Sequence, residues 1–523
     1  MHVYNTHFSG KKSVKKNNKR WSTGVAHRGY GLPVRELIVQ HVFASQSHAL
    51  DQALASKPQY ETTFIAASQQ FDKEPDSDGG SAVQVYARES SKLMVEVVKR
   101  GSRPKEDREI EPELATDHIF DISRGRRAFI DAEEAKELLK PLKEPENKFT
   151  KICFSNRSFG LPAAHVATTI LSGIKAQLTE VDLSDIVSRR PEPEAVQVLK
   201  MFSSALEGSD LSYLNLSNNA LGEKGVRAFG DLLKSQSNLV ELHFMNAGIL
   251  PDAAKAICEL LPSTSKLKVL HFHHNMSGDD GAVAISQLIK GSSNLEDFRC
   301  SSTKIGSGGG IALSEALGTC TLLKKLDLRD NNFGPKAGVA LSQAISLHAN
   351  LTDLYLSYLH LEDEGTIAIA DALKNSNSTI QIIEMAGNNI TCDSAKSFAE
   401  FITAKKHSLT KINLSENELR DEGAIAIGKA LEEEFGQLCI VDLSANSIRS
   451  DGAKTLAKAV VGKLRFRLLN VNGNMLSYEG INEVREIFKD FPRMLGPLDN
   501  NHEGDDYDEL ESKLKDLEMK QKR

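Results

Sequence analysis

The sequence predicts an α/β solenoid of stacked repeats, a horseshoe with a parallel β-sheet on its inner wall and helices outside. One observation is the pattern L-x-x-L-x-L-x-x-N-x-L starting at Leu211, the signature of a leucine-rich repeat. Another is its regularity, because the frame restarts every 28 or 29 residues at Leu239, Leu267, Leu295, Leu323, Leu351, Ile380, Leu409, Leu438 and Phe466. The second half of each unit also has the apolar spacing of one helix face, as in Val226, Phe229, Leu232 and Leu233.

Composition excludes several classes of protein. The chain has 523 residues and a net charge of -7, which does not favour nucleic-acid binding. Its six cysteines form no C-x-x-C pair and are typical of reduced thiols in the cytosol or nucleus. No apolar run approaches the roughly 18 residues of a membrane helix, so membrane insertion is not expected. The start lacks the apolar core of a secretory signal.

Three segments are expected before the repeats. Residues 1–60 are predicted to be a basic, disordered arm, because residues 11–20 hold six Lys or Arg; a nuclear-localisation patch or an organellar transit peptide is the alternative. Residues 61–102 predict two short helices joined by a Gly-rich turn. Residues 103–148 predict a charged linker with a short helix that Asp131 caps and Pro141 ends.

The repeat domain is expected over residues 149–498, as about twelve units in a ribonuclease-inhibitor-like arrangement. Counting from the first apolar residue of each unit, offsets 0, 3 and 5 are apolar and should be buried beside a short strand. Offset 8 is asparagine in seven units, and these side chains should bond the backbone of neighbouring strands as a ladder: they are Asn219, Asn275, Asn331, Asn388, Asn417, Asn446 and Asn474.

Offset 7 should instead lie at the rim of the horseshoe, with its side chain available to a partner. In six successive units it holds Asn218, Asn246, His274, Ser302, Asp330 and Tyr358. Asn246 precedes Ala247, which stands where the ladder asparagine should be. Asn246 therefore either takes over the ladder role or faces a partner.

One unit is too long. The unit from Leu178 runs 33 residues to Leu211, and its extra residues follow the strand, around Arg189 and Arg190. They predict a loop that protrudes at the rim, where insertions in repeat arrays often bind partners. After the repeats, residues 499–523 predict an acidic and then mixed-charge tail, either solubilising or attracting a partner.

The sequence contains no G-x-x-x-x-G-K-[ST] phosphate loop, no nucleophile elbow and no H-E-x-x-H. One alternative to a binding protein is a zinc enzyme, because His243 and His271 fall at offset 4 of adjacent strands and His273 lies two residues on. Polar residues on the inner wall of a repeat protein more commonly contact a protein partner.

Several strings resemble the plant Ran GTPase-activating proteins. These are SAVQVYARESSKLM at 81–94, KICFSNRSFG at 151–160, LNLSNNALG at 214–222 and LDLRDN at 326–331, and the resemblance covers about residues 71–498. A generic repeat protein would share the leucines but not these strings.

The resemblance implies a GTPase activator that supports nucleocytoplasmic transport and is not itself an enzyme. Members of the family bind Ran loaded with GTP and accelerate hydrolysis, while Mg²⁺ and GTP belong to Ran, so no cofactor is expected. Asn246 would position Ran's own glutamine. Arg189, Arg190, Asn219 and Asp330 would bind the partner, with an arginine-finger role for Arg190 as the minority view and a purely structural role for Asn219 left open.

The resemblance also implies further partners and a cellular location. A Ran-binding protein is a further possible partner, and the cytoplasm, possibly at the cytoplasmic face of the nuclear envelope, is the expected location. Plant members carry an N-terminal domain named for a Trp-Pro-Pro motif, and the resemblance implies a partial form of it at residues 61–102, with its final helix over 81–100. The one tryptophan here is Trp21, however, followed by Ser22 and Thr23. Nuclear-envelope anchor proteins are therefore not carried over as partners. A repeat scaffold that grips its partner without stimulating it is the alternative function.

Overall fold

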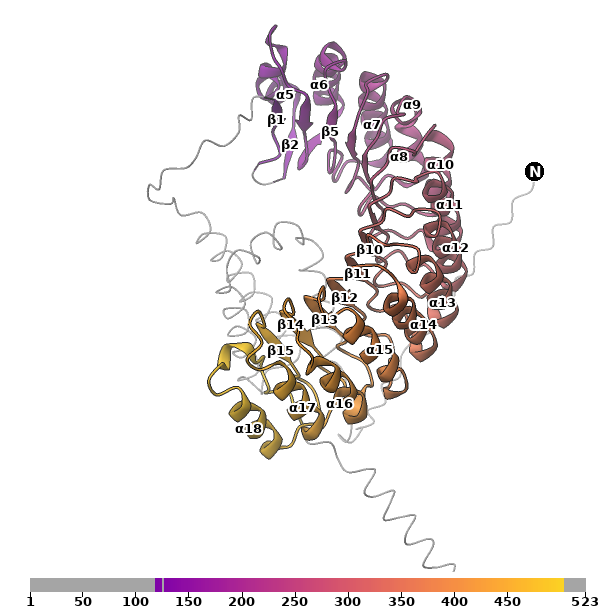
Figure 1. Cartoon of the computed structure of the whole chain (residues 1–523). Coiled ribbons are helices and arrows are strands. Elements are labelled where there is room, and N and C mark those ends of the chain that lie inside the picture. Colours follow the sequence, from indigo (N-terminus) through magenta and orange to yellow (C-terminus); the bar gives the residue numbers. More distant parts are fainter. Residues whose placement is uncertain (1–117, 125–126, 503–523) are drawn as a thin grey trace, which may run out of the picture. The chain divides into compact units, whose positions relative to one another are not determined.

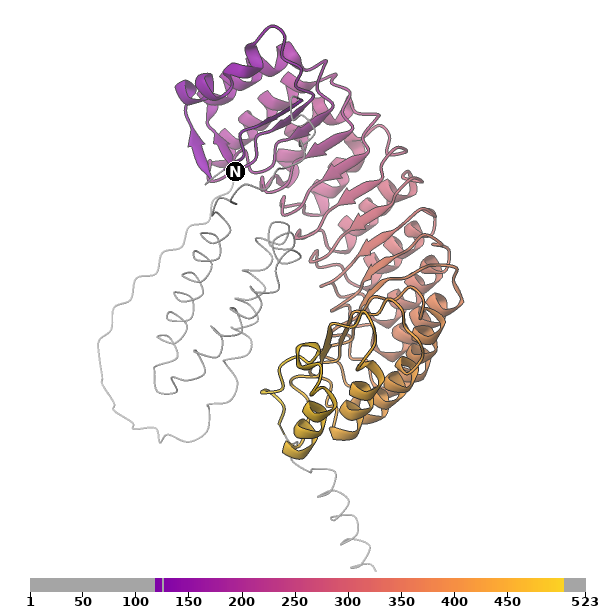
Figure 2. The ribbon, with the colours of Figure 1, turned by 60° about the vertical axis from the view of Figure 1, so that its left-hand side comes forward.

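The computed structural model describes residues 118–124 and 127–502 (Figure 1). The predicted basic arm, the two helices over 61–102 and most of the predicted tail lie outside the described residues. Over the described part the predicted α/β repeat solenoid is confirmed, with strands along the inner side of the array and helices along the outer side (Figures 1 and 2). No helix of that part is long and apolar enough to cross a membrane.

Thirteen short strands form one sheet in which every described pairing is parallel. The central residue of each strand is buried. Equivalent leucines lie side by side on adjacent strands, as Leu214 pairs in register with Leu242 and Leu242 with Leu270. In sheet order the strands are β1 (Ile119–Asp121), β3 (Lys151–Cys153), β5 (Glu180–Asp182), β6 (Tyr213–Asn215), β7 (Glu241–His243), β8 (Val269–His271), β9 (Asp297–Arg299), β10 (Lys325–Asp327), β11 (Asp353–Tyr355), β12 (Ile382–Glu384), β13 (Lys411–Asn413), β14 (Ile440–Asp442) and β15 (Leu468–Asn470).

The helices pack side by side behind the sheet, and their buried faces follow the predicted apolar spacing. The helix expected around Gly225 is interrupted at Phe229 and forms two short ones. The helices are α5 (Ala132–Leu138), α6 (Leu161–Ile174), α7 (Glu192–Leu206), α8 (Gly222–Ala228), α9 (Gly230–Lys234), α10 (Pro251–Leu260), α11 (Gly278–Lys290), α12 (Ser307–Leu317), α13 (Gly334–Ile345), α14 (Glu362–Asn375), α15 (Cys392–Ala404), α16 (Arg420–Leu431), α17 (Ser450–Val460) and α18 (Tyr478–Ile487), with 3-10 turns η1 (Lys140–Lys143) and η2 (Pro492–Met494).

The turn from strand to helix has one backbone conformation throughout the array. Offset 7 has a positive φ, from 47° at Asn246 to 69° at Gly473, in every one of the predicted units. This left-handed conformation suits Asn, Asp and Gly, and it costs other residues more. The positions are Asn156, Asp185, Asn218, Asn246, His274, Ser302, Asp330, Tyr358, Gly387, Glu416, Ala445 and Gly473.

The sheet begins earlier than predicted, inside the segment that we expected to be a linker. Strand β1 pairs in parallel with β3, and Phe120 joins the core against Phe149 and Phe154. The short helix of this segment is confirmed, because the Asp131 side chain accepts a hydrogen bond of 2.8 Å from the Glu134 backbone N–H at the start of α5. A two-stranded parallel pair, β2 (Ala128–Ile130) and β4 (Arg157–Phe159), lies beside this first unit.

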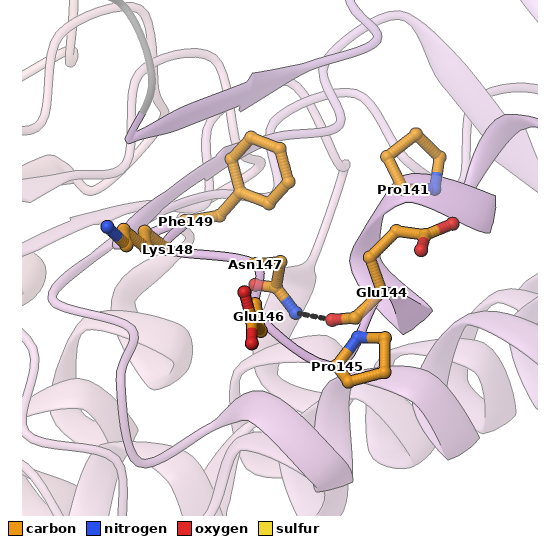
Figure 3. Close-up of a pocket in the computed structure, with 7 residues that line it drawn as sticks. All are labelled: Pro141, Glu144, Pro145, Glu146, Asn147, Lys148 and Phe149. Carbon is orange, nitrogen blue, oxygen red and sulfur yellow. Dashed lines mark hydrogen bonds between the residues drawn. The ribbon is translucent and has the colours of Figure 1, made fainter.

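The connection from η1 to β3 is closely held. It surrounds a hollow of about 770 Å³ lined by Pro141, Glu144, Pro145, Glu146, Asn147, Lys148 and Phe149 (Figure 3). The Asn147 side chain donates to the carbonyls of Leu142 and Glu144, each at 3.0 Å, and accepts from Gln177. These bonds fix the turn that precedes β3.

The long unit does not protrude as predicted. Ile186 and Val187 are buried in the core, and the Ile186 carbonyl accepts from the Phe159 backbone N–H at 2.8 Å. Asp185 is also buried, and its carboxylate pairs with Arg127 at 2.6 Å. The apolar pair draws the inserted residues onto the first units, and within the segment 185–190 Arg189 alone is exposed.

The array is closed at its other end by residues of the predicted tail. The Asn501 side chain accepts from the Asn474 backbone N–H at 2.8 Å and donates to the Leu498 carbonyl, so it supplies a last rung to the asparagine ladder. Leu469 of β15 also bridges to Leu495. The folded unit therefore extends beyond residue 498.

Candidate functional site

A hollow lies on the rim where the strand-to-helix turns of four neighbouring units meet. Its volume is about 530 Å³, and it is lined by Asn246, Gly248, Leu250, His274, Asn275, Met276, Ser302, Lys304 and Asp330. The hollow brings together Asn246 and Asp330, two of the residues predicted to face a partner. Arg189 and Arg190 are not among its lining residues. We refer to this feature as the rim hollow.

Asn246 is presented to solvent on a fixed backbone. Its φ is 47°, and its backbone N–H donates to the His273 carbonyl at 3.0 Å, which ties the turn to the next unit. Its side-chain Nδ2 donates to Asn218 Oδ1 at 3.0 Å, on the neighbouring rim position. The residue is exposed, whereas Ala247 is buried. Of the two alternatives for Asn246, this geometry supports the partner-facing one.

The rim hollow carries charges of both signs. Asp330 and Lys304 are both exposed, at φ values of 55° and 58°, and neither side chain forms an ion pair with the described residues. Burial lowers the pKa of His274, the hollow's histidine, although Asp330 and Asp327 oppose that shift. The hollow thus offers one carboxylate and one ammonium group, with a histidine that favours its neutral form.

Arg190 is held against the first units rather than extended. Its guanidinium donates to the Ser158 carbonyl at 2.9 Å and to the Ser158 hydroxyl at 3.2 Å, and lies 3.5 Å from the Glu194 carboxylate. It also stacks over the Phe129 ring at 5.0 Å, and 18% of its side chain is exposed. Arg189 is the exposed neighbour, with a φ of 60°.

Asn219 is part of the ladder. Its Oδ1 accepts from the Ile186 backbone N–H at 2.9 Å, and its Nδ2 donates to the carbonyls of Leu183 and Leu216 at 2.8 and 3.1 Å. With the residue 5% exposed, little of it remains for a partner. The geometry favours the structural role for Asn219.

On the inner wall, charged side chains pair with one another. The Arg329 guanidinium contacts Asp327 at 2.8 Å and Glu384 at 3.2 Å, and Glu384 also holds Lys411 at 2.7 Å. Although burial opposes its charge, these carboxylates hold the pKa of Arg329 above its usual range. Asp297 likewise lies between Arg299 and His271, at 2.9 and 3.2 Å.

The histidines of the proposed zinc site do lie together, but as hydrogen-bonding neighbours. His243 Nδ1 lies 3.0 Å from His271 Nδ1, and the outer nitrogen of each ring faces a carboxylate, Glu241 or Asp297. Burial and the nearby His271 lower the pKa of His273 to about 2. Across residues 118–124 and 127–502, no group of three or more His, Cys, Asp or Glu residues is arranged to hold a metal, so the structure does not support the zinc alternative.

Comparison with known proteins gives two family matches and several relatives. The WPP domain matches residues 34–108, and the leucine-rich repeat matches residues 209–230, 319–342 and 405–428. RAN GTPase-activating protein 2 of Arabidopsis thaliana is 57% identical over 94% of this chain and 96% of its own length. The chain belongs to the Ran GTPase-activating protein family. RAN GTPase-activating protein 1 of the same plant is 60% identical over 88% of this chain and 87% of its own length.

The Ran GTPase-activating protein family also includes a more distant relative. Ran GTPase-activating protein 1 of Xenopus laevis is 33% identical over 23% of this chain and 21% of its own length. The WPP match starts at residue 34, which lies inside the segment 1–60 that we predicted to be an arm. The domain match is therefore longer than the partial one we had placed at 61–102, although the Trp-Pro-Pro string itself is absent.

Three residues that line the rim hollow were not among the site residues predicted from the sequence. Leu250, Met276 and Lys304 line it beside Asn246 and Asp330. The repeat frame contained a signal for them, because Leu250 and Met276 are apolar at offsets where the neighbouring units have glycine or polar residues.

Proposed function

We propose that this chain is a GTPase-activating protein for Ran, which binds Ran-GTP on its rim and orients Ran's own catalytic glutamine with Asn246. The observation that carries the proposal is the exposed Asn246 amide, mounted on a fixed turn at the edge of the rim hollow. Membership of the Ran GTPase-activating protein family supplies the identity of the GTPase.

The contribution of Asn246 is one of position. Asn218 occupies one N–H of its amide, which fixes the side-chain plane. The Oδ1 and the second N–H, which no described residue engages, are available to a glutamine side chain. Holding that glutamine in the orientation that aligns the attacking water removes an entropic part of the barrier. GTP and Mg²⁺ belong to the GTPase in this proposal, and the chain supplies no cofactor.

Arg190 does not act as an arginine finger in this proposal. Reaching a phosphate would require it to leave the Ser158 carbonyl, the Glu194 carboxylate and the Phe129 ring together. We assign it to holding the inserted segment in place, and Arg189 to contact with the partner. The chain then accelerates hydrolysis without a catalytic centre of its own, in support of nucleocytoplasmic transport from the cytoplasm, with a Ran-binding protein as a further partner.

A single-turnover assay tests the proposal. Ran loaded with radiolabelled GTP is mixed with a catalytic amount of the full chain, and phosphate release is followed. We expect a large acceleration that saturates with the concentration of the chain. Tight binding of Ran-GTP with an unchanged rate would favour the scaffold alternative, and neither binding nor acceleration would reject both.

A further inference from the structure

Two apolar side chains in the rim hollow are exposed to solvent and lie outside the hydrophobic core. Leu250 is 49% exposed and Met276 is 55% exposed, and both line the hollow. Single exposed apolar residues are common on protein surfaces, and Leu464, at 93%, is one here. Two that line the same hollow, next to the proposed catalytic asparagine, form a small apolar patch of the kind that marks an interaction site.

Leu250 can be compared with the residues at the same offset in the other units. It stands at offset 11 of its unit, where the units from Leu211, Leu267, Leu295 and Leu323 all have glycine. It directly precedes α10, with an extended backbone at φ -82° and ψ 171° that does not require leucine. The exposed leucine therefore does not follow from the turn.

Met276 departs from the pattern in the same way. It stands at offset 9, where the three units that follow have Lys304, Asn332 and His360. The next of these, Lys304, is itself part of the hollow. The patch is thus bounded by an ammonium group, and by the Asp330 carboxylate one unit further on.

We propose that the rim hollow receives one apolar side chain from the surface of the GTPase, between Leu250 and Met276, while Lys304 and Asp330 pair with an acidic and a basic residue beside it. This inference rests on the proposed function and names the docking contact that brings Asn246 to the glutamine. The occupant is a polypeptide segment, because a solvated apolar patch edged by opposite charges matches a protein surface of complementary pattern.

The apolar contact and the proposed catalytic amide should affect different kinetic quantities. Leu250 and Met276 would act on binding in the ground state and in the transition state alike, so they change the concentration of the chain that gives half-maximal acceleration. Asn246 would act on the rate at saturation. The opposite charges at Lys304 and Asp330 should make binding depend on salt.

The test uses the full chain with Leu250→Ser and Met276→Asn combined. The exposed parts of the two side chains together amount to about one whole apolar side chain, whose burial corresponds to about tenfold or more in affinity. We therefore expect the half-maximal concentration to rise by about tenfold or more, with an unchanged rate at saturation and an unchanged melting curve. Lys304→Glu should also weaken binding and reduce its salt dependence. Met475→Asn, at offset 9 of the last unit, is the matched control and should stay within about twofold of the parent chain.

Each outcome has a distinct meaning. A double variant with the parent's half-maximal concentration would overturn the inference, as would one that lowers only the saturating rate. Direct titration of Ran loaded with a fluorescent GTP analogue measures binding separately from acceleration. If the parent chain binds Ran but does not accelerate hydrolysis, the proposed function fails, and the effect of the double variant on binding still tests the docking contact. If sedimentation shows that the parent chain self-associates and the double variant does not, the hollow is instead an interface between copies.

Discussion

The inner wall and the rim are built from the same repeat, within a few residues of each other, yet they use their charges differently. On the wall, Arg329 joins Asp327 and Glu384, and Glu384 joins Lys411, across four strands. On the rim, Lys304 and Asp330 are exposed and make no ion pair with the described residues. Parallel strands about 4.8 Å apart bring wall side chains within reach of one another. Charge on the wall stabilises the array, and charge on the rim is available to a partner.

Removing the Asn246 side chain should give the largest change in activity. We expect Asn246→Ala to lower the saturating hydrolysis rate by about 100-fold, because a glutamine that is no longer oriented loses the alignment of the attacking water. The melting temperature should hardly change, since Ala445 occupies the same offset with a φ of 52°. Single-turnover kinetics and calorimetry on the same preparation measure both quantities.

Asn219→Ala is the matched control for that experiment. It removes an asparagine one unit away, but one whose side chain satisfies buried groups of Ile186, Leu183 and Leu216. The free energy of unfolding should fall by about 2 kcal/mol, with a near-normal rate for the folded protein. If Asn246→Ala lowered stability and Asn219→Ala lowered the saturating rate instead, the assignment of Asn219 to the ladder and Asn246 to the rim would be wrong.

Neutralising the wall at Glu384 should reduce stability and spare activity. In Glu384→Gln the charges of Arg329 and Lys411 lose a partner whose side chain is 10% exposed, and we expect a loss of about 2 kcal/mol in the free energy of unfolding. Asp330→Asn makes the same chemical change on the rim, and there the expected effect is weaker Ran binding with little change in stability. Urea denaturation measures the stability of both variants, and titration with Ran measures their binding. An equal loss of stability in the two variants would contradict the difference between wall and rim charges.

A smaller effect should appear on acidification. His273 has a pKa of about 2 in the folded chain, against about 6.5 when unfolded, because burial and the neighbouring His271 disfavour its charged form. The unfolded state therefore takes up a proton that the folded state does not, and stability falls as the pH drops below about 6.5.

His273→Met, which copies Met245 at the same offset of the preceding unit, should remove this loss. Between pH 6.5 and 4.5 the variant should lose less stability than the parent, by about 1 kcal/mol per pH unit. Parallel slopes of stability against pH in the two proteins would show that His273 does not contribute.

Periodicity in the sequence was enough to predict the array, its buried leucines and its asparagine ladder, because each depends on residues at fixed offsets. It missed β1, since Ile119–Asp121 lacks the full repeat frame. It mispredicted the long unit because the partners that hold it, Arg127 and Ser158, lie far away in sequence. Asn501 was missed because a single polar residue in a polar stretch carries no periodic signal.

For the candidate site, the offsets placed Asn246 and Asp330 at the rim, and the structure brings both to one hollow. Their roles came from resemblance and stay predictions. Leu250 and Met276 could have been found by comparing equivalent offsets between units, whereas Arg190's contact with Phe129 could not, because it depends on how the inserted segment folds back.

The repeated left-handed turn restricts the chemistry that the rim can present. No offset-7 residue in the array is Val, Ile or Thr, whose branched side chains are strained at positive φ, and none is Lys or Arg. Besides His274 and Tyr358, the offset-7 positions carry amides, carboxylates and small groups, so a permanently charged cation has to come from another position, such as Lys304 two residues after Ser302. An activator on this scaffold is thereby suited to acting through an amide on a fixed turn, because no guanidinium group stands at offset 7.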